Sequence, residues 1–426
     1  MKYVLAILVL SLIIIIHELG HFIIAKASGV KVVEFSLGMG PRLIKFTKGG
    51  TMYSLKLFLF GGSCQMLGED EDNNDEGSFN SKSVWKRIAI IAAGPIANFV
   101  LAFIGAVLLI GIVGYDPAIV HSVEKDSTAY EAGLQAGDKI IDVNGTNITF
   151  YGDYSMYLLF NEGKDLEITV LRDGKEQVVT FSPEYIKEDV YQIGIYMDSE
   201  KALIESVVDG YPAQKAGLKE KDKIISVDGV ACESSDKVVE LVQKAEGKEV
   251  VLVVERDGKE VTINLTPNIV HREYYDDGFY LSGERVKCNP LETIKYSFQQ
   301  VGYWIKTVFY SFRLIFSGEA GFNDLSGPVG IVTMIGDVVE ESKSDGALYV
   351  FLNITNWIIM ISANLGVMNL LPIPALDGGR LIFLFIEAIR KKPIPKEKEG
   401  IIHFVGIVLL LMLSVAVLVN DIRKLF

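Results

Sequence analysis

The sequence predicts a polytopic α-helical membrane protein with four transmembrane helices, two inserted α+β domains and a membrane-associated β-hairpin. Half of the 426 residues are hydrophobic and the mean hydropathy is +0.31, which is unusual for a purely soluble protein. Apolar runs long enough to cross a bilayer lie toward both ends of the chain, whereas the centre is polar and repeats itself. The net charge of −13 argues against a nucleic-acid partner.

The first apolar run, residues 4–25, carries His17-Glu18-Leu19-Gly20-His21 near its end. Two histidines four positions apart share one face of a helix, so both imidazoles can reach one cation. Glu18 projects about 100° from His17 and can hold a water without ligating the metal. Ionisable side chains in a membrane helix are costly unless they face a protein or water interior. The pattern predicts a zinc site of the His-Glu-x-x-His type inside the membrane.

Two other interpretations of this run stay open. Ala25-Lys26-Ala27 after an apolar stretch resembles a signal-peptide cleavage site, although the stretch is too long for a signal. The two histidines could also be ordinary core residues.

Residues 26–87 are rich in basic residues, which predicts a cytoplasmic loop and therefore an N-terminus outside. The nine basic residues are Lys26, Lys31, Arg42, Lys45, Lys48, Lys56, Lys82, Lys86 and Arg87. Within this loop, residues 51–60 (TMYSLKLFLF) are β-branched and aromatic, and Gly61-Gly62 follows. We expect a strand and turn, with residues 63–67 as the second half of a hairpin.

Three further apolar stretches complete the membrane part. Residues 88–113 predict a second span, with Asn98 bonding across a helix interface, and residues 350–371 and 401–419 predict two more. Residues 291–316 carry polar side chains along their length. If they also crossed the membrane, Asp377 would emerge outside, although six basic residues follow it between 380 and 398. We therefore expect an amphipathic helix on the outer interface and an outer C-terminus.

Residues 116–268 contain a tandem repeat. The segment 132–145 (AGLQAGDKIIDVNG) recurs as 216–229 (AGLKEKDKIISVDG), and 172–176 (RDGKE) recurs as 256–260, both offset by 84 residues. Each copy resembles a PDZ domain of the bacterial type, although Lys221 replaces Gly137 and could alter that turn. PDZ-like domains bind peptides at a sheet edge. A rigid spacer that binds no peptide is the alternative.

A catalytic zinc needs a third protein ligand and one open position. In residues 364–380 (NLGVMNLLPIPALDGGR) two prolines break a helix just before Asp377. Irregular backbone at membrane depth is tolerated where it lines a cavity, so Asp377 is the preferred third ligand. Glu34 is the rival, and a helix-capping Asp377 with no metal is a third possibility.

The motifs occur in a characteristic order: HELGH (17–21), AGPIAN (93–98), the PDZ-like insert, LSGPVG (325–330) and NLLPIPALDGG (369–379). Together they resemble the site-2 protease family, bacterial RseP type, across most of the chain. The resemblance implies that His17, His21 and Asp377 bind Zn²⁺ and that Glu18 is the catalytic acid/base. It also implies a membrane-dipping β-hairpin with a Gly-Gly-Tyr turn, where this chain has Gly61-Gly62-Ser63.

We therefore expect a zinc-dependent intramembrane endopeptidase of a bacterial cytoplasmic membrane, with its termini and PDZ-like domains outside and its site toward the cytoplasm. Its expected substrates are transmembrane proteins, such as anti-sigma factors already shortened outside, or remnant signal peptides. Asn364 and Asn369 are candidate substrate-binding residues, as are Leu55 and Leu57 on an edge strand that would hold unwound substrate.

Two other functions stay open for the chain. One is a membrane-anchored protease that acts on soluble or misfolded proteins, and the other is a non-catalytic PDZ scaffold. The expected domains are 1–115 and 350–426 (membrane halves), 116–187 and 188–268 (PDZ-like domains) and 269–349 (linker and amphipathic helix). Cys64, Cys232 and Cys288 show no metal-ligand spacing.

Overall fold

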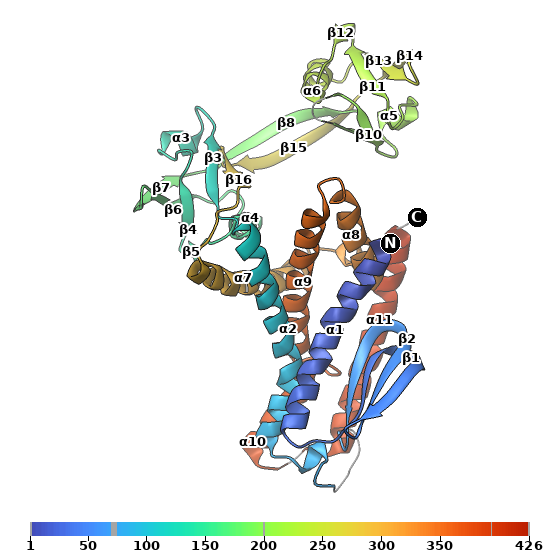
Figure 1. Cartoon of the computed structure of the whole chain (residues 1–426). Helices are drawn as coiled ribbons and strands as arrows, with labels where there is room; N and C mark the ends of the chain where they lie inside the picture. Colours follow the sequence, from blue (N-terminus) through green and yellow to red (C-terminus); the bar gives the residue numbers. More distant parts are fainter. Residues whose placement is uncertain (1, 70–74, 199–200, 393, 425–426) are drawn as a thin grey trace. The chain divides into compact units, whose positions relative to one another are not determined.

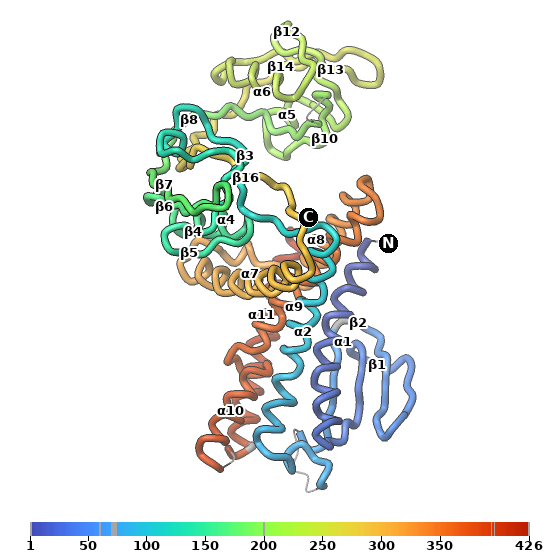
Figure 2. The backbone as a smooth tube through the Cα atoms, turned by 60° about the vertical axis from the view of Figure 1, so that its left-hand side comes forward, coloured from blue at the N-terminus to red at the C-terminus, as the bar shows by residue number. Residues whose placement is uncertain are grey.

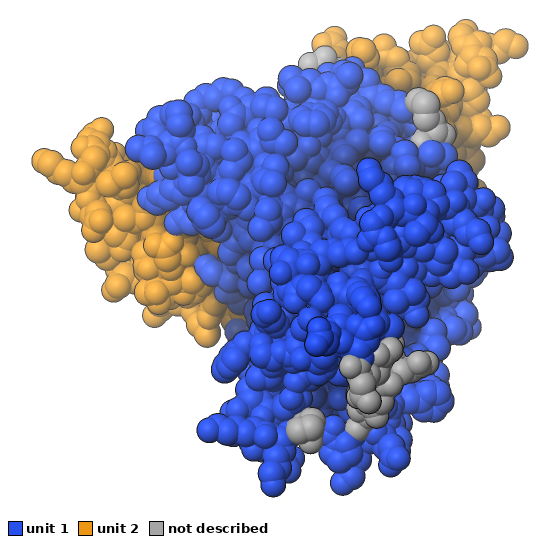
Figure 3. Space-filling view, turned by 60° about the horizontal axis from the view of Figure 1, so that its bottom comes forward, with its two compact units in different colours: residues 1–116, 284–426 blue, residues 117–283 orange. Residues whose placement is uncertain are grey.

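The computed structural model describes residues 2–69, 75–198, 201–392 and 394–424. The chain divides into two compact units, one formed by residues 1–116 with 284–426 and the other by residues 117–283 (Figure 3). The first unit holds the membrane helices, and the second holds the tandem repeat.

Among the described residues of the first unit, four helices are long and apolar enough to cross a membrane, which confirms the predicted fold class (Figure 1). They are α1 (Lys2–Ala27), α2 (Val84–Val113), α9 (Ala347–Leu370) and α11 (Lys396–Lys424). α2 packs against both α1 and α9 (Figure 2). In the most apolar 18-residue stretch of α11 only 11% of the residues are buried, against 33–39% in the other three helices. α11 is therefore the most loosely packed of the four.

The described part of this unit also contains three shorter or amphipathic helices. α7 (Pro290–Ser317) packs on α2 and α9 and exposes apolar side chains such as Leu291 and Phe316, as expected for an interfacial helix. α8 (Pro328–Glu341) packs on α1, and α10 (Asp377–Arg390) packs on α2. Two short 3₁₀ helices, η1 (Phe79–Ser81) and η2 (Phe322–Asp324), lie in connections.

The predicted hairpin between residues 51–60 and 63–67 is wrong. β1 (Val32–Lys48) and β2 (Thr51–Met66) are joined instead at Gly49-Gly50, where both φ angles are positive (59° and 75°), the conformation that glycine adopts without steric cost. Residues 34–37 pair with 52–55 on one side and with 62–65 on the other, while 42–48 pair with 51–56. The sequence offers two Gly-Gly turn signals, and the first one makes the tight turn.

The second unit contains each element of the repeat twice. The first copy has β3 (Ile119–Val123), α3 (Thr128–Glu131), β4 (Lys139–Val143), β5 (Thr146–Asn147), α4 (Tyr151–Leu159), β6 (Leu166–Arg172), β7 (Lys175–Phe181), β8 (Glu184–Gln192) and β9 (Ile195–Met197). The second copy has β10 (Ile204–Val207), α5 (Pro212–Lys215), β11 (Lys223–Val227), β12 (Val230–Ala231), α6 (Ser235–Lys244), β13 (Val250–Arg256), β14 (Lys259–Leu265), β15 (Asn268–Asp276) and β16 (Phe279–Ser282).

The two copies exchange their last strands. β9, which ends the first copy, pairs with β10 of the second, and β16, which ends the second copy, pairs with β3 of the first. β8 and β15 pair along their whole length and connect the two domains. Most of β15 and all of β16 lie within residues 269–349, which were predicted to be a linker and amphipathic helix, so this part of the prediction is wrong. The strands were missed because their pairing partners, β8 and β3, lie far away in the sequence.

The repeated motifs have the same structural role in both copies. Arg172 makes a bidentate ion pair with buried Asp138, and Arg256 makes the same pair with buried Asp222. Lys221 adopts a positive φ of 69°, close to the 91° of Gly137, so the replacement does not change the turn.

Candidate metal centre

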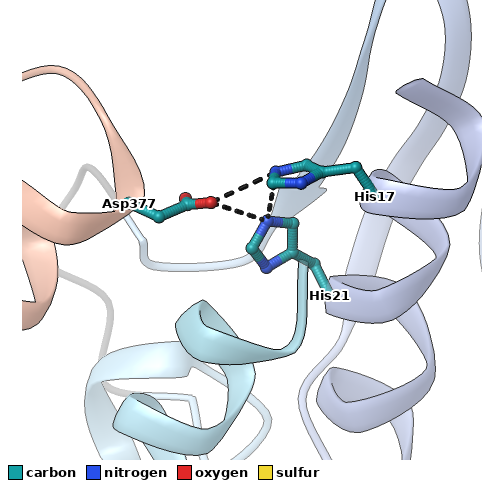
Figure 4. A group of neighbouring side chains, drawn as sticks. All are labelled: His17, His21 and Asp377. Atoms are coloured by element: carbon teal, nitrogen blue, oxygen red, sulfur yellow. Dashed lines mark hydrogen bonds and ion pairs between the residues drawn. The ribbon is translucent and has the colours of Figure 1, made fainter. Parts of the chain in front are cut away.

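His17, His21 and Asp377 converge at one point between α1 and the start of α10 (Figure 4). His17 Nε2 lies 3.2 Å from His21 Nε2. Asp377 Oδ2 lies 3.1 Å from His17 Nε2 and 3.4 Å from His21 Nε2. Both histidines are buried, and among the described residues these three form the one group of His, Cys, Asp or Glu side chains spaced to hold a metal.

These separations match the requirements of a tetrahedral zinc ion. Nitrogen and oxygen ligands about 2.0–2.2 Å from zinc lie roughly 3.3–3.6 Å from one another in a tetrahedron, close to the 3.1–3.4 Å between these three atoms. Asp377 Oδ2 is also buried with no hydrogen bond of good geometry among the described residues, although two imidazole nitrogens face it. A carboxylate oxygen and two Nε2 atoms at this spacing fit a shared zinc ion.

The second ring nitrogen of each histidine is held by α2. His21 Nδ1 lies 2.8 Å from the Ile90 carbonyl oxygen, and a carbonyl can only accept, so Nδ1 carries the proton and Nε2 keeps its lone pair for a metal. His17 Nδ1 lies 3.3 Å from the Asn98 amide nitrogen, while Asn98 Oδ1 has no partner among the described residues. Exchanging the two amide atoms of Asn98 lets its oxygen accept from His17 Nδ1–H and leaves both Nε2 atoms ready to bind.

Gly94 allows α2 to pass directly against both imidazoles. A Cβ at Gly94 would lie 2.2 Å from His21 Nε2 and 2.8 Å from His17 Cε1. Gly20 similarly lies against the Ala93 carbonyl, where a Cβ would be 2.2 Å from the oxygen. The two helices are therefore in backbone contact at the level of the site.

Asp377 is the first residue of α10 and follows the irregular segment after α9. Pro372 and Pro374 lack the N–H that a continuing helix requires, which explains why the helix ends before Asp377. Gly378 and Gly379 then allow the chain to turn back closely, since a Cβ at Gly378 would lie 2.1 Å from the Leu371 carbonyl oxygen. The carboxylate is thus placed by a tight, glycine-dependent turn.

Glu18 lies on the turn between the two histidines and faces the β-sheet. A Cβ on Gly62 would lie 3.0 Å from Glu18 Cγ, and the Cys64 backbone amide lies within interaction range of the carboxylate. The strand segment next to Glu18 is therefore residues 62–65, which have a pairing partner on one side only among the described residues.

The other predicted site residues lie elsewhere. Asn364 and Asn369 are both on α9, and Asn364 Oδ1 is buried without a partner among the described residues. Leu55 pairs with both Leu37 and Ile44, so the expectation of an edge strand at Leu55 is wrong. Leu57 has an exposed side chain.

The rival ligand Glu34 belongs to the sheet and is absent from the histidine–aspartate group. It accepts hydrogen bonds from Arg42 Nη2 (2.6 Å) and Ser54 Oγ (2.5 Å). The Arg42 guanidinium lowers the pKa of this buried carboxylate to about 2. The side chain of Glu34 therefore links β1 to β2.

Sequence reasoning missed the parts of α2 that hold the histidines. Asn98 was expected only to bond across a helix interface, and that bond goes to His17. The signal that could have found it is the spacing in Gly94-Pro95-Ile96-Ala97-Asn98, since positions four apart share one helix face.

The chain matches the model of peptidase family M50 over residues 5–413. It is 32% identical to the regulator of sigma-E protease RseP of Escherichia coli, covering 98% of each chain. It is 29% identical to the regulator of sigma-W protease RasP of Bacillus subtilis (99% and 98%) and 28% identical to the zinc metalloprotease RasP of Geobacillus kaustophilus (99% and 97%). A solved PDZ domain of HtrA3 is similar to 20% of this chain and 92% of its own, with 20% identity and a TM-score of 0.19. The chain therefore belongs to peptidase family M50 and is an intramembrane zinc metalloprotease of the site-2 protease type, a bacterial membrane protein related to RseP and RasP.

Proposed function

We propose that the chain cleaves transmembrane segments of single-span proteins at a Zn²⁺ ion held by His17, His21 and Asp377. The observation that carries this proposal is the set of three ligand-atom separations between 3.1 and 3.4 Å, which suits tetrahedral zinc. Three protein ligands leave a fourth position for water or substrate.

Glu18 is the proposed general base and acid. When bound, zinc polarises the scissile carbonyl and lowers the pKa of water. Glu18 shares a helix turn with His17 and His21 without belonging to the ligand group, so its carboxylate accepts the proton of the attacking water and returns it to the leaving amine.

The substrate strand is proposed to add to residues 62–65. A transmembrane helix shields its peptide bonds by internal hydrogen bonding, so it must unwind before cleavage. Unwound backbone in hydrocarbon needs new partners, and these residues have a partner on one side only among those described and lie next to Glu18. Asn364 and Asn369 are proposed to donate to substrate carbonyls from α9.

The proposed substrates are anti-sigma-factor-like proteins whose outer domains have already been removed, and remnant signal peptides. Supporting this, two relatives are named as regulators of sigma-E and sigma-W.

We also propose that the ligating end of the membrane helices faces the cytoplasm, and that both termini and residues 117–283 lie outside. Lys26 at the end of α1, Lys86 and Arg87 at the start of α2, and Arg390 at the end of α10 lie at this end, in agreement with the positive-inside rule.

A peptide ligand is proposed for the second PDZ-like domain. A cavity of about 420 Å³ lies between residues 193–197 and α6, which contributes Val238 and Val242. In the first domain the residue equivalent to Val238 is Tyr154, whose hydroxyl donates to Asp277 Oδ2 at 2.6 Å. This bond joins the helix to the chain just before β16, so the equivalent place in the first domain is occupied by its own side chain.

The decisive experiment compares membrane proteomes of cells that carry wild-type protein or Glu18→Gln. Single-span fragments that lack their outer domains should accumulate in the variant. Accumulation of soluble proteins alone would indicate the quality-control protease instead. A wild-type protein that retains zinc but cleaves no substrate would indicate a scaffold.

A further inference from the structure

We propose that His403, on α11, is a positioning residue that holds the loop carrying Asp377 in its zinc-binding conformation. The inference rests on the proposed ligand role of Asp377 and assigns a function to the loosely packed last helix.

In the loop before Asp377, the N–H groups of Leu371, Ile373 and Leu376 donate to carbonyls of preceding residues, whereas the N–H of Ala375 has its partner on another helix. Pro372 and Pro374 have no N–H to donate, and Ala375 adopts a positive φ of 77°. A left-handed backbone is unfavourable for a residue with a side chain, so the surroundings must stabilise it. The N–H of Ala375 donates to His403 Nδ1 at 3.0 Å, and this is the contact by which another helix holds the strained residue.

The surroundings of His403 favour the tautomer that this bond requires. Nδ1 can accept from Ala375 only if it carries no proton, so the proton must be on Nε2. Glu399 Oε1 lies 3.7 Å from Nε2, and its negative charge favours a proton there. The ring also packs edge-on against Phe383 of α10, with 5.5 Å between centroids. His403 thus touches both the loop before Asp377 and the helix that follows it.

A second contact lies one turn further along α11. A Cβ at Gly406 would lie 2.5 Å from Pro374 Cβ and 2.6 Å from the Pro374 carbonyl oxygen. The helix and the loop are therefore in close contact at two consecutive residues of the loop. His403 and Gly406 are therefore two points at which the N-terminal half of α11 contacts the segment that carries Asp377.

The test measures zinc affinity of the full-length purified protein by chelator competition, with three variants of His403. His403→Leu removes the acceptor for the Ala375 N–H and should weaken zinc binding about 10-fold, the lower end of the loss expected for a residue bonded directly to a metal ligand. His403→Asn keeps an acceptor near the position of Nδ1 and should restore most of the affinity. His403→Gln places its acceptor one methylene further out and should behave like the leucine variant.

A double variant separates positioning from general packing. If His403 acts through Asp377, then Asp377→Ala combined with His403→Leu should bind zinc no more weakly than Asp377→Ala alone, because coupled residues are not additive. Additive losses, or equal losses in the asparagine and glutamine variants, would overturn the inference. If His403→Leu does not fold, the asparagine and glutamine variants decide between the two outcomes.

The same measurements distinguish this inference from the proposed zinc site. Wild-type affinity in Asp377→Ala would show that Asp377 is not a ligand, and the proposed site would fail. Weak binding in Asp377→Ala with unchanged binding in His403→Leu would leave the site standing and reject only the role of His403.

Discussion

At the scale of single residues, the site depends on how closely α2 approaches the imidazoles. Gly94 has no side chain where His17 and His21 lie, and Ile90 and Asn98 on the same helix hold the outer nitrogens of the two rings. The zinc site is therefore as much a property of α2 as of the histidine helix, and changes of a single carbon atom on α2 should reach the metal.

Gly94→Ala should greatly weaken zinc binding and abolish proteolysis, because the new Cβ would lie 2.2 Å from His21 Nε2. Gly111→Ala is the matched control on the same helix, since a Cβ there would come no closer than 3.9 Å to Thr293. Zinc stoichiometry and cleavage of a helical substrate should be measured in both. Full zinc occupancy in Gly94→Ala would show that the helices can move apart without loss.

Glu18→Gln should keep zinc and lose turnover. The amide cannot accept a proton, and general-base catalysis contributes about 10²–10⁴-fold to rates, so we expect a loss of that order with unchanged metal content. Purified variant and wild type should be compared on one substrate by metal analysis and initial rates. Cleavage within a factor of about three of wild type would remove Glu18 from the role of base.

At the scale of elements, the sequence predicted those features that depend on local pattern. The four membrane helices follow from apolar runs, and the repeat follows from its own recurrence. The β-sheet was mispredicted because local strand signals do not encode which segments pair: residues 51–56 pair with 42–48 across the Gly49-Gly50 turn and with 34–37, and not with 63–67. The same reason explains why β16 was not expected, since its partner β3 precedes it by more than 150 residues.

The candidate site shows the same division between local and distant information. His17, Glu18 and His21 were found because they lie within one helix turn. Asp377 was found because two prolines break the helix just before it, at the expected membrane depth of the two histidines. Asn98 and His403 were not assigned to the site, because each touches it only through contacts with segments 28 to 81 residues away.

The buried ion pairs of the second unit predict a pH dependence. Burial alone would raise the pKa of Asp222, but the Arg256 guanidinium outweighs this and holds it below its usual value. A lowered pKa stabilises the fold above the unfolded value of about 3.9, and this contribution is lost as the pH falls through the lower folded value.

Arg256→Met should therefore destabilise residues 117–283 by about 3–5 kcal/mol at neutral pH, because it leaves Asp222 buried and unpaired. The difference from wild type should shrink below about pH 4, as Asp222 becomes neutral. Urea unfolding of the 117–283 fragment at several pH values measures this. Lys237→Ala, which breaks an exposed pair with Glu240, is the control and should change stability by less than about 1 kcal/mol. A loss independent of pH would mean that packing, and not the ion pair, is responsible.

At the scale of the whole molecule, the second unit (residues 117–283) is an insertion whose two connections to the first unit meet. Tyr115 donates to the Val286 carbonyl at 3.1 Å, and Val286 donates to the Tyr115 carbonyl at 2.8 Å. A Cβ on neighbouring Gly114 would lie 2.2 Å from the Val286 oxygen. The two chain segments that flank residues 117–283 are thus hydrogen-bonded to each other within the first unit. The connection between α2 and α7 does not depend on residues 117–283.

Replacing residues 117–283 with a short Gly-Ser linker should leave the zinc site intact. If this folded mass excludes bulky substrates, the variant should cleave substrates that still carry large outer domains, which the wild type should cleave only after shortening. Zinc content serves as the folding control, and shortened and intact versions of one substrate provide the comparison. Unchanged discrimination in a zinc-loaded variant would assign substrate selection to the membrane unit.

The exchange of β9 and β16 between the two repeats has a consequence for how the second unit unfolds on heating. Each domain includes a strand that belongs to the other repeat, so unfolding of one domain removes the pairing partner of a strand from its neighbour. Two tandem domains joined by an ordinary linker would melt in two steps. These two domains should unfold in one cooperative transition. A single cleavage of the backbone in β8 or β15 should leave the two fragments bound to each other until both domains unfold.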